Sequence, residues 1–157
     1  MVSWRIISVV LGVLFVSFGL GGGVFAAGSD QMKAAGGVTV YLGVVPAEIV
    51  KGLPATGTRE QPMHGGVPKG PHEYHVVAAV FDAASGARIS DAGVTAQISG
   101  IGLSGSKKQL EPMQIAGTTT YGGFFDLPGY DLYTVKLTVE RSGASPVVLE
   151  FNYDHRR

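Results

Sequence analysis

The chain has no cysteine among its 157 residues. This absence excludes disulfide bonds, thiolate nucleophiles, iron–sulfur clusters and any copper or zinc site built on cysteine. A folded part without disulfides must be held together by its apolar core alone. A domain of about 130 residues can achieve this, because folding removes about two-thirds of its unfolded surface from water.

Charge is also scarce. Only 15% of the residues are charged, and 12 basic residues balance 12 acidic ones. No basic stripe runs along the chain, so nucleic acid is excluded as a partner. Glycine is abundant instead, with 24 residues. Many glycines together with little charge are typical of an all-β domain with many turns.

The N-terminus has the three parts of a signal peptide. One positive charge, Arg5, precedes an apolar run over residues 6–20, and a glycine triplet follows it. Val24 and Ala26 provide the small-residue spacing for cleavage after Ala26, so residues 1–26 are predicted to be removed and the protein to be periplasmic or secreted. An uncleaved membrane anchor is the alternative, since residues 6–27 are long enough to span a bilayer.

Short runs rich in β-branched residues follow one another along the mature chain. Residues 27–37 read as a flexible lead-in, and residues 38–157 as a single domain. Alternation places Val94, Ala96 and Ile98 on one face, and the same pattern recurs in the last two runs. The predicted strands are 38–45, 74–82, 94–99, 109–116, 118–126, 133–140 and 147–153, with 47–53 as a possible further short strand. About seven strands without an amphipathic helix predict an immunoglobulin-like antiparallel β-sandwich.

Residues 75–153 carry motifs of a known family. His75 to Asp82 is followed by Ser85-Gly86 and by Asp91-Ala92-Gly93-Val94, and residues 121–129 lead into Tyr133-Thr134-Val135-Lys136-Leu137. This order resembles the YtkA-like family of small exported bacterial domains. The resemblance implies an Ig-like fold, an exported or membrane-tethered location and a binding module rather than an enzyme. It assigns no role to the loop that precedes His75.

That loop, residues 54–73, gathers metal-ligand side chains. Met63, His64 and His72 lie in it, and His75 opens the apolar strand that follows. Met113 could approach from another strand. Imidazole and thioether without thiolate suit copper before zinc or iron. The sequence therefore predicts a copper site formed by His72, His75, His64, Met63 and Met113.

Simpler explanations compete with the metal site. Residues three apart on a strand face opposite sides, so His72 and His75 converge only if the chain bends at Pro71. Otherwise the loop histidines are solvated, and Met113 is a core residue. The aromatic residues 121, 124, 125, 130 and 133 likewise predict a satellite core under a hairpin, with a partner-docking patch as the alternative.

Enzymatic function has little support in the sequence. Residues 100–105 match a G-x-G-x-x-G pattern, but no helix can start before Pro112, so nucleotide binding is excluded. No serine lies in a nucleophile elbow. We therefore expect no enzyme. Two functions stay open: an exported copper carrier or accessory domain, and a metal-free interaction module whose partner is a membrane or periplasmic protein of a cell-envelope or respiratory assembly.

Overall fold

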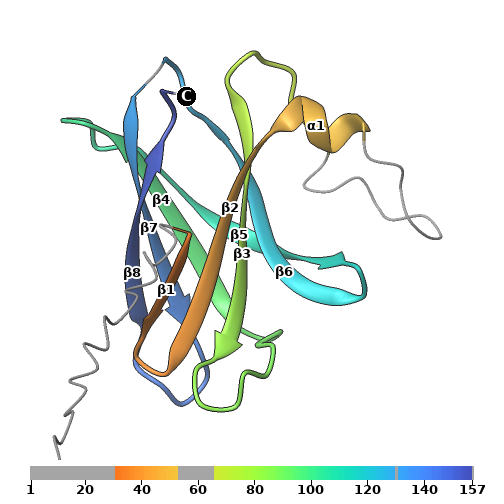
Figure 1. Cartoon of the computed structure of the whole chain (residues 1–157), viewed down its shortest axis with the longest axis vertical. Helices are drawn as coiled ribbons and strands as arrows, with labels where there is room; N and C mark the ends of the chain where they lie inside the picture. Colours follow the sequence, from red (N-terminus) through yellow and green to blue (C-terminus); the bar gives the residue numbers. More distant parts are fainter. Residues whose placement is uncertain (1–30, 53–65, 130, 157) are drawn as a thin grey trace, which may run out of the picture.

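The computed structural model describes residues 31–52, 66–129 and 131–156. Within these ranges the chain forms eight strands and one short helix (Figure 1). Hydrogen bonding joins the strands in the order β1-β2-β3-β6-β5-β4-β7-β8, with every neighbouring pair antiparallel. The elements are β1 (Met32–Ala35), β2 (Val38–Pro46), α1 (Ala47–Gly52), β3 (Glu73–Asp82), β4 (Gly93–Gly100), β5 (Ser106–Ile115), β6 (Thr118–Asp126), β7 (Leu132–Glu140) and β8 (Val147–Asp154).

The array folds into a β-sandwich because β5 belongs to both of its sheets. The first half of β5 pairs with β4 as far as Leu110, and the second half pairs with β6 from Glu111 onward. Pro112 follows this change of partner, on the half of β5 that pairs with β6. A proline has no N–H for a neighbouring strand, so it is tolerated where pairing on one side has ended. The prediction of an all-β antiparallel sandwich is confirmed.

The core lies between the two sheets, and strand alternation builds it. Val76, Ala78 and Val80 are fully buried on β3, and Val94, Ala96 and Ile98 face them from β4 as predicted. Tyr121 and Phe125 bring the largest fully buried rings from β6. The Tyr121 hydroxyl accepts a hydrogen bond from the Ala92 N–H and donates one to the Ile89 carbonyl. The core therefore holds the connection between β3 and β4 as well as the sheets.

Three local predictions were wrong. Residues 47–52 form a helix where a short strand was possible, because Ala47 and Lys51 favour helix and Glu48 complements the helix N-terminus. Met32–Ala35 forms a strand inside the segment predicted as a flexible lead-in, pairing with Val38–Tyr41. Strand β5 begins at Ser106, earlier than predicted, because Ser106 to Leu110 pair with β4. The strands in the described part of the chain therefore number eight where about seven were expected.

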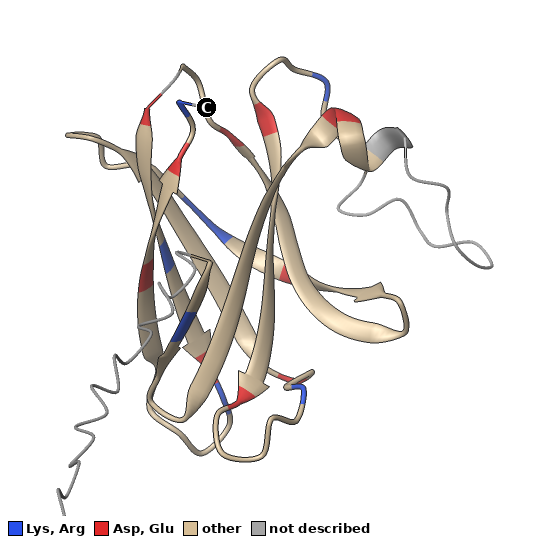
Figure 2. Ribbon diagram, viewed as in Figure 1, with Lys and Arg blue, Asp and Glu red and all other residues tan. Residues whose placement is uncertain are grey.

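Charged side chains are spread over the described surface. Figure 2 shows lysine and arginine interspersed with aspartate and glutamate on both sheets, without a stripe of one sign. Among the residues described, no helix is long and apolar enough to cross a membrane. The predicted signal peptide, residues 1–26, lies outside the described residues.

Candidate metal site on the outer face of β3, β6 and β5

Strand register brings one histidine and one methionine to the same face of a sheet. On β3, His75 pairs with Phe124 of β6, and on β5, Met113 pairs with Thr120 of the same strand. Gly122 lies between these two positions of β6 and faces the same way. The neighbouring residues 76 and 121 point into the core. His75, Gly122 and Met113 therefore lie on the outer face of the sheet.

Gly122 marks the point at which the two side chains meet. A Cβ atom added to Gly122 would lie 2.6 Å from Met113 Sδ and 2.8 Å from His75 Nε2. The sulfur and the nitrogen can therefore be no further apart than the sum of those two distances. The absence of a side chain at residue 122 leaves the space between them open.

Both groups are shielded from solvent although they face away from the core. The exposed fraction is 3% for His75 and 8% for Met113. The His75 ring packs against the Phe124 ring with 4.7 Å between centroids and an angle of 31° between planes. Met113 does not belong to the main core cluster, which is formed by the inner faces of the two sheets. Met113 is nevertheless a buried apolar residue, as its interpretation as a core residue expects.

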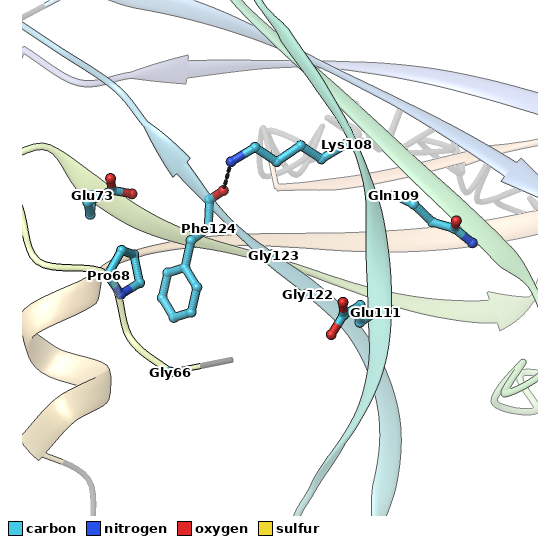
Figure 3. Close-up of a pocket in the computed structure, with 9 residues that line it drawn as sticks. All are labelled: Gly66, Pro68, Glu73, Lys108, Gln109, Glu111, Gly122, Gly123 and Phe124. Atoms are coloured by element: carbon cyan, nitrogen blue, oxygen red, sulfur yellow. Dashed lines mark hydrogen bonds between the residues drawn. The ribbon is translucent and has the colours of Figure 1, made fainter. Parts of the chain in front are cut away.

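A hollow of about 300 Å³ lies beside Gly122 and Phe124 (Figure 3). Its charged wall groups are the carboxylates of Glu73 and Glu111 and the ammonium of Lys108. The Lys108 Nζ donates a hydrogen bond of 2.7 Å to the Phe124 carbonyl and lies 5.0 Å from the centroid of the Phe125 ring. The lining consists of Gly66, Pro68, Glu73, Lys108, Gln109, Glu111, Gly122, Gly123 and Phe124.

The other predicted ligands lie elsewhere or cannot be placed. His72 is exposed and precedes β3 by one residue, and its carbonyl accepts a hydrogen bond from the Leu127 N–H. His72 is therefore in a different environment from the buried His75. Met63 and His64 lie outside the described residues. Within residues 31–52, 66–129 and 131–156, no group of three or more His, Asp or Glu side chains is placed to hold a metal ion.

Sequence reasoning missed Gly122 and Glu111. Glu111 pairs directly with Gly122 across β5 and β6 and lines the hollow. The only signal for this arrangement was the Gly122-Gly123 pair inside an aromatic β-strand, because a glycine in a strand interior often marks a close approach of other groups. The predicted satellite core was wrong, because Tyr121, Phe125 and Tyr133 belong to the main core. Phe124 is buried beside His75 on the outer face, and Tyr130 lies outside the described residues.

A second histidine is buried at the end of the sandwich where β3 begins. The exposed fraction of His155 is 8%, and its Nε2 lies 2.6 Å from the Tyr74 hydroxyl. Its ring also contacts the rings of Tyr153 and Tyr133, at 5.9 Å in each case. Burial raises the pKa of both of these phenols. These contacts fix the end of the chain against the strand that carries His75.

Comparison with solved structures places the fold among small bacterial domains. A DUF4426 family protein from Pseudomonas aeruginosa PAO1 has 14% identity and a TM-score of 0.54, covering 79% of this chain and 94% of that one. A copper-bound variant of FetP from uropathogenic Escherichia coli strain F11 has 11% identity and a TM-score of 0.59, covering 80% and 93%. A copper-bound variant of Campylobacter jejuni P19 has 11% identity and a TM-score of 0.53, covering 78% and 92%.

Identities this low show a shared fold and nothing further. No protein-family description and no curated protein matches the sequence. Membership of the YtkA-like family therefore stays a prediction. The chain has the β-sandwich fold that FetP, P19 and the DUF4426 protein share.

Proposed function

We propose that this protein binds a transition metal ion, copper first, between His75 Nε2 and Met113 Sδ. The observation that carries the proposal is their convergence on Gly122, where a Cβ atom would lie within 2.8 Å of both atoms. Side chains from two strands that are not neighbours in the sheet meet at this point, and no side chain of β6 lies between them. The resulting gap is bordered by two atoms that bind metals.

The donor chemistry fits copper. A neutral imidazole accepts either oxidation state of copper, and a thioether favours Cu(I). Bonds of about 2.0–2.1 Å to imidazole nitrogen and about 2.3 Å to sulfur, taken from zinc sites as a scale, allow one ion to bridge the pair after a small side-chain shift. Both side chains end in flexible or rotatable groups, so such a shift needs no backbone movement. The Glu111 carboxylate, an oxygen group of the kind that suits Cu(II), lines the hollow beside Gly122.

The structural comparisons support the same conclusion. The FetP and P19 variants with this fold are both described as copper-bound. More than nine-tenths of each of those chains is covered, so the likeness extends over whole domains. FetP has been produced in the periplasm of Escherichia coli. The same compartment is our proposal for this chain, on the basis of the apolar N-terminal run and its cleavage motif. Mass spectrometry of a periplasmic fraction will show whether the chain begins near Ala27.

The role that fits these groups is a carrier or accessory domain rather than an enzyme. The candidate site offers a soft ligand pair beside an open hollow, and such a site can take up and release an ion. We therefore place this protein among metal-handling proteins of the cell envelope.

Calorimetric titration of the full chain with Cu(I) and with Cu(II) tests the proposal. Met113→Leu removes the sulfur and keeps the packing, because exchange of leucine and methionine usually costs less than about 1.5 kcal/mol. His75→Phe keeps a ring against Phe124. We expect each variant to weaken copper binding by about tenfold or more, equivalent to about 1.4 kcal/mol. His72→Ala is the control and should bind copper as the wild type does. Equal copper affinity in the wild type and in both site variants would overturn the proposal.

One observation favours the second candidate, a metal-free interaction module. Ile101 and Leu103, at the tip of the β4–β5 loop, have exposed fractions of 72% and 69%. If this candidate holds, a double Ile101→Ser and Leu103→Ser variant should lose a co-purifying envelope partner that the wild type retains. If it loses no partner, the loop is not an interaction surface.

A further inference from the structure

A second surface lies on the outer face of the sheet, at the end of β3 opposite to His75. Strand register pairs Met32 of β1 with Tyr41 of β2, and Phe81 of β3 with Arg88 of the connection that follows β3. The residues that alternate with them on β2 and β3 are buried in the core, so these four side chains point outward. We call Met32, Tyr41, Phe81 and Arg88 the Arg88 face.

Two contacts of the Phe81 ring join the Arg88 face into one surface. The rings of Tyr41 and Phe81 meet edge to face, with 5.5 Å between centroids and 81° between planes. The Cζ atom of the Arg88 guanidinium lies 4.2 Å from the Phe81 centroid. Met32 and Tyr41 are large apolar side chains that stay exposed. Aromatic residues, methionine and arginine are enriched in protein–protein interfaces, and tyrosine and arginine are enriched among the residues that dominate binding.

Arg88 has a nitrogen atom that the described part of the chain does not satisfy. Its Nη1 is shielded from solvent, and no described residue accepts a hydrogen bond from it. Asp82, the acidic residue that ends β3, lies 3.8 Å from Arg141 instead. A buried charged donor without an acceptor costs free energy. A carboxylate bound to Arg88 would offset that cost, and this nitrogen has already lost its water in the free protein.

The strands beside Arg88 offer no charge that competes with it. No acidic residue occurs in β1 or β2. Lys33, the basic residue of β1, points to the core side, with its Nζ 5.7 Å from the centroid of the Phe151 ring. Arg88 as a whole is only partly buried, so a carboxylate can approach its guanidinium from solvent. A complementary partner therefore has one carboxylate among apolar side chains.

We propose that the Arg88 face binds a segment of a partner protein in which an aspartate or glutamate lies between apolar residues. The carboxylate accepts hydrogen bonds from the Arg88 guanidinium, and the apolar neighbours pack on Met32 and Tyr41. Arginine suits this role because its planar fork, stacked on Phe81, can bind both carboxylate oxygens. Phe81 is about 20 Å from His75 along β3, at the rise of a strand. The inference therefore does not depend on copper binding.

The probes are two blocked peptides, Gly-Leu-Glu-Leu-Gly and Gly-Leu-Gln-Leu-Gly, which differ only in the charge of the central residue. Each is titrated into the full chain, and NMR spectra follow the backbone amides and the arginine Nε–H signals. We expect the glutamate peptide to bind about tenfold more tightly or better, and to shift the signals of Tyr41, Phe81 and Arg88. Arg88→Met keeps an unbranched stem over Phe81 and should remove the preference for glutamate. Arg156→Met is the matched control, because that guanidinium already pairs with Asp154.

A preference for glutamate that is lost in Arg88→Met and kept in Arg156→Met supports the inference. No binding of either peptide, equal binding of the two by the wild type, or an unchanged preference in Arg88→Met would overturn it. Self-association that Arg88→Met abolishes, measured by sedimentation, would also overturn it, because the occupant would then be a second copy. Arg88→Lys keeps the charge without the planar fork, so it should weaken the preference even if Arg88→Met does not fold.

Discussion

His75 Nε2 and Met113 Sδ approach each other across a strand that belongs to neither residue. The two side chains come from β3 and β5, and β6 lies between those strands in the sheet. The contact is possible because β6 has a glycine at residue 122, where any side chain would lie within 2.8 Å of both atoms. The candidate metal site therefore depends as much on the missing side chain as on its ligands.

Gly122→Ala should block this site without unfolding the protein. The added methyl group would occupy the space between the two donors, which would hold the proposed ion. Both obstructing atoms are at the ends of side chains that can turn away. We expect copper affinity to fall about tenfold or more, while the thermal midpoint changes little. Calorimetry and thermal unfolding together measure the two effects. Gly93→Ala is the matched control, because its nearest neighbour atom would be at 3.7 Å. Unchanged copper affinity in Gly122→Ala would contradict the assigned position of the ion.

The strands of the sandwich were predictable from the sequence because alternation has a direct physical cause. In β4 and β7 the buried residues are the alternate apolar ones, as strand geometry requires when one face is covered. Helix α1 was missed because Ile49 and Val50 favour strands. In the structure the helix preference of Ala47 and Lys51 outweighs them, and the helix begins directly after Pro46. Strand β1 was missed because its side chains are exposed and show no pattern.

The candidate site was predictable only in part. His75 and Met113 were both named as ligands, but their partnership through Gly122 depends on two strand registers. A shift of one residue in either register would turn a side chain to the opposite face of the sheet. Single-sequence reasoning does not fix registers between strands that are distant in the chain. It instead joined His75 to its sequence neighbour His72, which the structure places in an exposed turn.

Tyr121→Phe should destabilise the fold through its lost hydroxyl. The hydroxyl bonds the Ala92 N–H at 3.0 Å and the Ile89 carbonyl at 3.2 Å, so phenylalanine leaves both backbone groups without this partner. The expected loss in the free energy of unfolding is about 1–3 kcal/mol, measured by urea denaturation. Tyr41→Phe is the control, since its side chain is 49% exposed, and it should change stability by less than about 0.5 kcal/mol. Equal stability of the two variants would show that the Tyr121 hydrogen bonds contribute nothing.

Two glycines of the β4–β5 loop should respond differently to alanine. Gly102 and Gly105 both have positive φ, at 74° and 70°. A Cβ atom added at Gly105 would lie 2.1 Å from the Ile98 carbonyl oxygen. A Cβ atom added at Gly102 would have no other group within 4 Å. Gly102→Ala should cost about 1–2 kcal/mol for the left-handed backbone alone. Gly105→Ala should cost clearly more, because the obstructing atom is backbone and β4 must shift. Thermal unfolding of both variants measures the difference, and equal costs would show that the loop moves freely away from β4.

Stability should decrease in alkaline solution because of tyrosines that are buried or partly buried. Burial raises the pKa of Tyr121, Tyr133 and Tyr153 above the ordinary phenol value. An unfolded phenol ionises near about pH 10, whereas these phenols keep their protons to higher pH in the folded chain. Above about pH 10 the folded state therefore binds more protons than the unfolded state, so the free energy of unfolding falls as pH rises.

The contribution of these phenols to the free energy of unfolding is fully present below their pKa in the unfolded chain. It is lost as pH rises through their higher pKa values in the folded chain. Urea denaturation at successive pH values measures the slope, and absorbance at 295 nm follows phenolate formation directly. Tyr153→Phe removes one of the three groups and should make the slope shallower. A wild-type stability that stays constant above about pH 10, or a slope unchanged by Tyr153→Phe, would contradict the assignment of this alkaline loss to the buried phenols.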